Sequence, residues 1–254
     1  MIFYKKIKKF QALTFDLDDT LYDNNSHMPV AEAAFLHDLY QQYPLTRQLD
    51  PNEWRKHRHA ALQNNPRLKN DMGELRRQIL KGIFASLGFN GSQLQQSINH
   101  SFECFYFHRS NFKVDENIHS LLDQLAQRYP LIAITNGNVD ISQIGLAPYF
   151  SHILNLPMKP NSAMFDASQA ALKMAPEQIL HIGDNLHNDI YGAIKAGFQS
   201  AWYAHDRAME TKKESMFLLP NIQLNKLNEL LEFDSLNFSW YAYLEFKAIK
   251  NKHF

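Results

Sequence analysis

Three carboxylates stand within four positions near the start of the sequence, directly after a short apolar run. They are Asp16, Asp18 and Asp19, and the run that precedes them is residues 12–15. Carboxylates this close together repel one another, so a folded chain keeps them in place chiefly where a cation or a reaction requires them. The pattern predicts a site that holds a metal ion and supplies a nucleophile.

Further polar groups follow apolar runs later in the chain. In order, they are Thr135, Asn136, Gly137, Lys159, Asp184 and Asp189. Because the carboxyl ends of strands in a doubly wound sheet meet at one crevice, we expect these groups to converge. Acids, a hydroxyl, backbone donors beside a glycine and one cation form a set suited to phosphoryl transfer.

The segments that position these groups predict an α/β fold. Short apolar, β-rich runs alternate with segments of helical periodicity that end at proline or glycine. The predicted strands are residues 12–15, 131–135, 153–156, 179–183 and 199–203, and the predicted helices are residues 116–129, 164–174 and 189–196. This alternation is typical of a Rossmann-like, doubly wound parallel sheet covered by helices on both faces.

More than a hundred residues separate the first predicted strand from the second, far beyond an ordinary connection. Two apolar stripes of helical spacing run through this segment, and we expect both to pack inside a helix bundle rather than to contact a ligand. The stripes are Met72, Leu75, Ile79, Ile83 and Leu87, then Leu94, Ile98, Phe102, Phe105 and Arg109. We therefore predict an α/β core over residues 1–22 and 112–234, with an inserted all-α subdomain over residues 23–111.

Residues 235–254 form a tail that combines aromatic and basic side chains. The aromatic ones include Phe238, Trp240, Tyr241, Tyr243 and Phe246, and lysines follow them. A docking helix, a dimer contact and a helix on a membrane surface are three possible roles. Packing against its own domain is the interpretation that we favour.

Overall composition argues against several classes of partner. Twenty-six basic and twenty-six acidic residues cancel, so no net field favours nucleic acid or an anionic membrane surface. Cys104 is the single cysteine, which excludes an internal disulfide, and we expect it to be a core residue. With no apolar run of leader or membrane-span length, we expect a cytoplasmic protein without an integral membrane segment. The oligomeric state stays open.

The ordered polar segments resemble the four motifs of the haloacid dehalogenase superfamily. The matching residues are Asp16-Leu17-Asp18-Asp19-Thr20, Thr135-Asn136-Gly137, Lys159, and Gly183-Asp184 with Asp189. The resemblance extends over about residues 10–220 and implies that residues 23–111 are the helical cap of this superfamily's first cap class. It also implies Mg²⁺-dependent hydrolysis of a small phosphorylated metabolite.

A role for each matching residue follows from the resemblance. Asp16 is expected to attack phosphorus and form an aspartyl-phosphate, and Asp18 to act as general acid and base. The implied ligands of Mg²⁺ are Asp16, Asp184 and the main-chain carbonyl of Asp18. Asp189 is expected to tune the metal from behind these ligands or to replace a water molecule. Alternatively, Asn188 and Asp189 simply cap the next helix.

The remaining motif residues are the ones that the resemblance assigns to substrate binding. Thr135, Lys159 and the amides of Asn136 and Gly137 are expected to hold the phosphate oxygens. Lys159 would also balance the negative charge of the acids. Thr20 is grouped with them and is expected to fix the loop by a hydrogen bond.

Three other polar residues near the motifs are expected to take no direct part in the chemistry. We expect Asp19 to cap a helix or turn, His181 to be a hydrogen-bonded core residue, and His187 to lie exposed in a loop. One position departs from the family pattern: relatives often carry an acid four residues after the motif lysine, where this chain has Ala163. We therefore expect Lys159 to be held differently here.

Asp18 bears on the type of reaction. Carbon–halogen cleavage needs no proton donor to an ester oxygen, whereas hydrolysis of a phosphate ester does, so Asp18 favours a phosphatase over a dehalogenase and also disfavours phosphonate cleavage. A phosphomutase uses the same pair of acids and remains an alternative. A catalytically idle binding module is the alternative of another class, against which the retained Asp16, Asp18, Lys159 and Asp184 argue.

Three longer runs narrow the expected substrate. Residues 12–24, 131–138 and 179–184 are similar to a bacterial branch of these phosphatases. That branch acts on flavin mononucleotide (FMN) and on the phosphorylated ribitylamino-pyrimidine of riboflavin biosynthesis. We expect a substrate of this kind, with a sugar phosphate or another nucleotide as the alternative.

Overall fold

A seven-stranded sheet forms the centre of the computed structural model, which describes residues 1–155, 159–205 and 218–234. The strand order is β1-β7-β6-β5-β2-β3-β4. The strands are β1 (Ile2–Phe3), β2 (Ala12–Phe15), β3 (Leu131–Ile134), β4 (His152–Leu154), β5 (Ile179–Gly183), β6 (Gln199–Tyr203) and β7 (Ile222–Leu224). Neighbours pair in parallel except for β1, which pairs antiparallel with β7. The predicted α/β fold class is confirmed.

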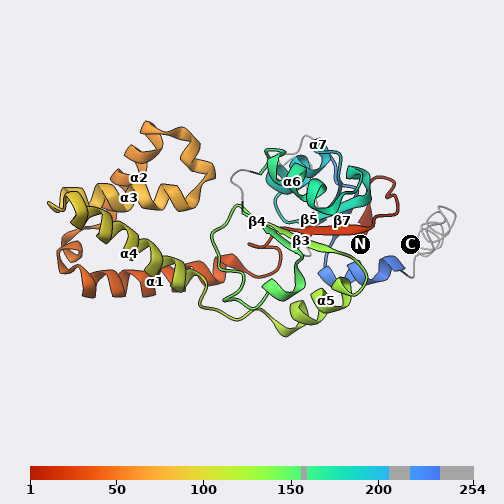
Figure 1. Ribbon diagram of the computed structural model, residues 1–254, viewed down its shortest axis with the longest axis horizontal. Helices are drawn as coiled ribbons and strands as arrows, with labels where there is room; N and C mark the ends of the chain where they lie inside the picture. Colours follow the sequence, from red (N-terminus) through yellow and green to blue (C-terminus); the bar gives the residue numbers. More distant parts are fainter. Residues whose placement is uncertain (156–158, 206–217, 235–254) are drawn as a thin grey trace, which may run out of the picture.

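Helices cover both faces of this sheet, as Figure 1 shows. On one face lie α5 (Glu116–Ala126) and η6 (Leu227–Asp234), and on the other lie α6 (Ala163–Leu172) and α7 (Gly192–Lys195). Every residue of β2, β3 and β5 is buried. Continuous burial is what a parallel strand between two helical layers requires, and it explains why these runs are apolar without alternation.

The register brings three strand ends to one level. Phe15, the last residue of β2, lies beside Ala133 of β3 and Ile182 of β5. The chain segments that follow these strands therefore leave the sheet next to one another. β2 is a central strand, and the strands that follow it in the chain lie on both of its sides. In an open α/β sheet, a ligand crevice forms beside such a strand, at the edge made by the carboxyl ends of the strands.

Four helices between β2 and α5 form a separate layer at one end of the sheet (Figure 1). They are α1 (Asn24–Gln42), α2 (Pro51–Asn64), α3 (Met72–Ser86) and α4 (Gly91–Arg109), with short 3₁₀ segments η1 (Pro44–Gln48) and η2 (Pro66–Asn70) between them. Asp23, Asp50 and Asp71 each accept backbone N–H groups at the start of α1, α2 and α3, which fixes where these helices begin. We refer to residues 23–111 as the cap and propose them as its bounds.

The interior of the cap matches only part of the two predicted stripes. Its buried cluster comprises Phe35, Leu39, Leu80, Phe84, Ile98 and Phe105. Met72, predicted to be buried, is 48% exposed, because it stands in the first turn of α3. Arg109 is buried, yet its guanidinium group does not pack within the apolar stripe. It contacts Asp18 of the sheet core instead.

Smaller helical elements complete the core, and one differs from expectation. They are η3 (Ala147–Tyr149), η4 (Pro176–Gln178) and the π-helical η5 (Leu186–Tyr191). The helix predicted to begin at Asp189 starts at Leu186, because the Asn185 side chain accepts the N–H groups of His187 and Asn188. In the part of the chain that the structure describes, no helix is both long and apolar enough to cross a bilayer. The predicted tail, residues 235–254, lies outside the described residues.

Candidate active site

Asp16 lies directly after β2, at the centre of the crevice. Its N–H donates to the carbonyl of Ile182 on β5 at 2.9 Å, so the strand pairing extends to this residue and fixes its backbone. The side chain is buried, its Oδ1 is ion-paired with Lys159, and its Oδ2 accepts a hydrogen bond from Thr20 Oγ1 at 3.4 Å. Burial raises the pKa of Asp16 well above its usual range, although the Lys159 ammonium opposes this shift.

Lys159 connects the acids of the site. Its Nζ contacts Asp16, donates to Asp189 Oδ1 at 2.7 Å, and donates to the carbonyl of Ile134 at 3.0 Å. Burial alone would lower the pKa of Lys159, but the two carboxylates outweigh burial and the pKa is raised. The side chain is 2% exposed and stays protonated, so it places a permanent positive charge beside Asp16.

Asn136 holds the backbone of Lys159. Its Nδ2 donates to the Lys159 carbonyl at 3.1 Å, and its Oδ1 accepts the Lys159 N–H at 2.8 Å. The two hydrogen bonds join the turn after β3 to the segment that carries the lysine, which begins with a cis Lys159–Pro160 peptide. Besides the phosphate contact expected of its amide, Asn136 thus has a second task that the sequence did not indicate.

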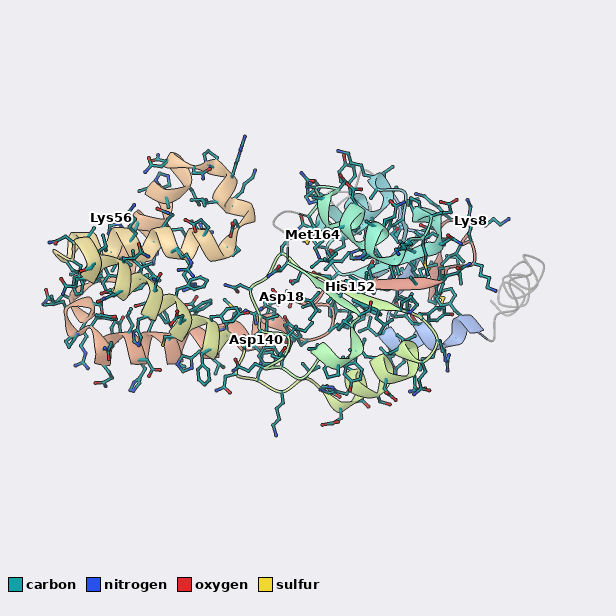
Figure 2. All side chains as sticks on the ribbon, viewed as in Figure 1. Lys8, Asp18, Lys56, Asp140, His152 and Met164 are labelled. Atoms are coloured by element: carbon teal, nitrogen blue, oxygen red, sulfur yellow. The ribbon has the colours of Figure 1, made fainter. Side chains whose placement is uncertain are left out.

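Asp18 faces the turn formed by Thr135, Asn136 and Gly137. The N–H of Gly137 donates to Thr135 Oγ1 at 2.8 Å, which closes the turn. A Cβ atom at Gly137 would lie 2.5 Å from Asp18 Oδ2 and 3.1 Å from Thr135 Oγ1, so a larger residue here would displace the Asp18 carboxylate. In Figure 2, Asp18 lies between the cap helices and the sheet.

Asp184 and Asp189 provide the other carboxylates of the site. Burial, together with the charges of Asp189 and Asp19, raises the pKa of Asp184 to about 7. Burial would also raise the pKa of Asp189, but Lys159 and His181 outweigh burial and lower it to about 2. Asn185 is the N-cap of this helical turn, and Asp189 Oδ2 accepts the N–H of Asn185 at 3.0 Å, so Asp189 also supports the start of the turn. Its side chain is 1% exposed and lies among the site charges.

The acids fit a hard divalent cation. Asp16, Asp184 and Asp189 each offer a carboxylate oxygen, and these atoms lie within 4.8 Å of one another. An all-oxygen donor set of this size suits Mg²⁺, which keeps several water ligands and takes one or two carboxylates from a protein. Asp16 and Asp184 are the residues that would hold it. Asp189 shares the Lys159 ammonium with Asp16, and our expectation that it tunes the metal from behind the ligands stays a prediction.

A cavity of about 370 Å³ lies between the core and the cap, beside the turn that follows β3. From the core it is lined by Thr135, Asn136, Gly137 and their neighbours, and from the cap by Asp71, Gly73 and Tyr106. Residues of both layers therefore surround whatever occupies it. A ligand here would meet the turn after β3 at one end and the cap helices at the other.

The sequence did not identify two residues that contact Asp18. Arg109, at the end of α4, is ion-paired with Asp18 Oδ1, and the hydroxyl of Tyr22 donates to the same oxygen at 2.5 Å. Arg109 stood in the stripe predicted to be bundle core. A charged residue at the end of an otherwise apolar stripe was the signal that could have marked it.

Asp19 and His181 behave as predicted, and His187 does so only in its exposure. Asp19 Oδ1 accepts the N–H of Asn24 at the start of α1, which is a capping role. His181 is fully buried, and its ring nitrogens lie 2.9 Å from Thr14 Oγ1 and 3.3 Å from an oxygen of Asp189. Burial lowers its pKa, which favours the neutral ring. His187 is exposed.

Several known proteins with similar sequence or structure are named as enzymes. Residues 10–197 match the sequence profile of the haloacid dehalogenase-like hydrolases. The chain is 30% identical to the 5-amino-6-(5-phospho-D-ribitylamino)uracil phosphatase YigB of Escherichia coli K12, over 91% of this chain and 98% of that protein. It is 29% identical to the pyrimidine 5'-nucleotidase PynA of Streptococcus pneumoniae R6, over 76% and 84% of the two chains. The crystal structure of a 2-haloacid dehalogenase from Pseudomonas syringae pv. tomato superposes with a TM-score of 0.80 at 30% identity, covering 89% of this chain and 98% of that one.

Proposed function

Since the chain belongs to the haloacid dehalogenase-like hydrolases, we propose that it uses Mg²⁺ and a phosphorylated Asp16 to hydrolyse a small phosphomonoester. Family membership, with relatives named as phosphatases, makes it a phosphoric monoester hydrolase. The observation that carries the mechanism is the buried Lys159 ammonium, which contacts Asp16 and Asp189 while both face the same crevice. The metal, the covalent step and the substrate are our proposal.

In the first step, Asp16 attacks phosphorus. A new bond forms between its carboxylate oxygen and phosphorus, and the ester bond to the leaving oxygen breaks. The electron pair of that bond leaves with the alcohol oxygen, which takes a proton from Asp18. Thr135, the amides of Asn136 and Gly137, and Lys159 would hold the phosphate oxygens during the attack.

In the second step, water cleaves the aspartyl-phosphate. Asp18, now deprotonated, takes a proton from the water as the oxygen attacks phosphorus, and Asp16 leaves as a free carboxylate. The return of the proton to Asp18 and of the carboxylate to Asp16 restores the starting enzyme. Asp16 and Asp184 would hold Mg²⁺, which would supply positive charge against the phosphate and the acids.

We propose FMN or the phosphorylated ribitylamino-pyrimidine as the substrate. Support comes from the relative YigB, whose name gives the second compound and which matches nearly the whole chain. A pyrimidine nucleotide is the next substrate to consider, because PynA is named as a pyrimidine 5'-nucleotidase. All three are phosphate esters of alcohols that carry a nitrogen heterocycle, which would extend toward the cap across the cavity that Asp71 and Tyr106 line.

Dehalogenation is the alternative reaction, because a structure at 30% identity is named as a 2-haloacid dehalogenase. Asp18 argues against it. Displacement of a halide requires no proton donor at the leaving atom, whereas Asp18 stands beside Asp16 with Oδ1 held by two donors. We therefore expect no halide release from 2-chloropropionate under conditions in which phosphate esters are hydrolysed.

Phosphate release from FMN, measured with Mg²⁺ and after removal of divalent cations by a chelator, tests the proposal. Asp16→Asn serves as the blank, because it retains the shape of the side chain without its nucleophilic oxygen. We expect Mg²⁺-dependent release that chelation lowers by at least about a thousandfold, since the metal both stabilises charge and orients the phosphate. Release that persists without divalent cations would contradict the metal role, and release by Asp16→Asn would contradict the covalent step. No release from FMN but release from a pyrimidine nucleotide would correct the substrate alone.

A further inference from the structure

We propose that Arg109 of the cap, together with Tyr22, positions Asp18 by holding its Oδ1 and so reserves Oδ2 for proton transfer. The inference rests on the proposed function, because it assigns a task within that reaction. It adds a residue outside the four sequence motifs to the machinery of the site. It also states which oxygen of the general acid faces the leaving group.

Both donors come from the two chain segments that connect core and cap. Tyr22 precedes α1, where the chain enters the cap, and Arg109 ends α4, where the chain leaves it. The two segments pack against each other: the ring of Phe112 lies 4.8 Å from that of Tyr22 and stacks at 4.0 Å on His27. The orientation of the Asp18 carboxylate is therefore coupled to the placement of the cap.

The second oxygen of Asp18 faces the phosphate-binding turn. A Cβ atom at Gly137 would lie 2.5 Å from Oδ2, which places this oxygen directly over the turn. Gly137 and Thr135 also line the cavity between core and cap. With Oδ1 engaged by two donors, Oδ2 is the oxygen left to carry a proton to a leaving group in this cavity.

A purely structural ion pair explains Arg109 poorly. Its side chain is 2% exposed, and its Nη1 is buried without a hydrogen-bond partner among the described residues. A buried donor that lacks a partner costs stability, and an apolar side chain of similar volume often packs more favourably than a buried ion pair. Within the described part of the cap, no other charged side chain is buried. The contact with Asp18 explains why Arg109 is buried here, whereas a gain in stability does not.

The test compares esters with poor and good leaving groups, since a general acid assists departure of a poor leaving group far more. The first turnover of FMN, or of glycerol 2-phosphate if FMN is not hydrolysed, is compared with that of 2,4-dinitrophenyl phosphate. Following the released alcohol or phenol isolates the attack by Asp16 from the later hydrolysis step. We expect full-length Arg109→Met to slow release of the alcohol at least about thirtyfold and release of the phenol less than about threefold.

Two further variants separate positioning from general damage. Arg109→Lys restores one charged donor and is expected to recover part of the lost rate. Tyr22→Phe removes one donor to Oδ1 with little change in packing, so it should give the same pattern with a smaller loss even if Arg109→Met unfolds. The matched control is Arg77→Met, because Arg77 bonds to Asn99 and lies over the ring of Phe102 within the cap. It should slow neither ester.

Equal slowing of both esters by Arg109→Met and by Tyr22→Phe would overturn the inference, because it would indicate a displaced cap rather than a misplaced acid. No slowing of either ester would also overturn it, since Asp18 would then be oriented without these donors. If the wild-type protein hydrolyses neither ester, the proposed function itself fails and the inference fails with it. The wild-type result therefore distinguishes the two failures.

Discussion

The sheet core and the cap handle charge in opposite ways. In the core, Asp16, Lys159 and Asp189 are almost fully buried and contact one another. In the cap, the pairs Lys56–Glu53, His108–Asp38 and Arg76–Glu32 are all at least partly exposed. Lys56 stands far from the site, on the outer helix of the cap (Figure 2).

This difference distinguishes the charges that we propose to take part in the chemistry from charges on an exposed surface. Exposed ion pairs contribute little to stability, because water and salt screen them. Buried charges cost several kcal/mol each to desolvate, on the order of what a good ion pair returns, so stability alone does not explain them. Burial of charge thus marks the candidate site in the core, and among the described residues of the cap Arg109 is the charged side chain that shares this burial.

The largest difference between core and cap is expected at two glycines with equally tight surroundings, one in each region. A Cβ at Gly137 would lie 2.5 Å from Asp18 Oδ2, and a Cβ at Gly82 in the cap would lie 2.5 Å from His57 Nδ1. We expect Gly137→Ala to lower kcat about a hundredfold, because displacing a catalytic group by about 1 Å has an effect of that size.

The control variant Gly82→Ala should change kcat less than about twofold, since the His57 side chain can shift and alanine favours the helix. Steady-state kinetics and thermal unfolding of both variants provide the measurement. Similar kcat values for the two would mean that close packing around Asp18 has no special importance.

Two asparagines, one in the core and one in the cap, should show a smaller difference in their effect on kcat. Asn136 Oδ1 accepts the N–H of Lys159 in the core, and Asn65 Oδ1 accepts the N–H of Arg67 in the cap. We expect Asn136→Ala to lower kcat about tenfold, because the lysine beside Asp16 loses both hydrogen bonds that hold its backbone.

Asn65→Ala should leave kcat unchanged and cost about 1 kcal/mol of stability at most, as loss of a capping side chain does. Chemical denaturation measures the stability and steady-state kinetics the activity. An unchanged kcat for Asn136→Ala would show that Lys159 keeps its place without this support.

Several elements of the fold could be predicted because their signals are local. β2, β3 and β5 are fully buried apolar runs, and each is followed by a polar motif. β1 was not predicted, since Ile2 and Phe3 are too few to form a pattern and become a strand only by pairing with β7. The start of η5 was misplaced by three residues, because Asn185 and Asn188 are equally good caps in sequence terms.

Some residues of the candidate site could likewise be predicted from the sequence, and others could not. Asp16, Asp18, Lys159 and Asp184 could be identified from the spacing of their motifs along the chain. The contact between Arg109 and Asp18 could not, because it joins residues 91 positions apart in the sequence and depends on how the cap meets the core. Periodicity finds the buried face of a helix, but it does not reveal what the charged end of a buried arginine contacts.

Trapping phosphate on Asp16 tests the central claim most directly. The full-length protein is mixed with FMN and Mg²⁺, quenched in acid within one turnover and treated with borohydride, which reduces an acyl phosphate of aspartate to homoserine. Peptide mass spectrometry then locates the reduced residue. We predict homoserine at position 16, dependent on both FMN and Mg²⁺. Phosphate release that proceeds without any reduced residue at position 16 would contradict the account.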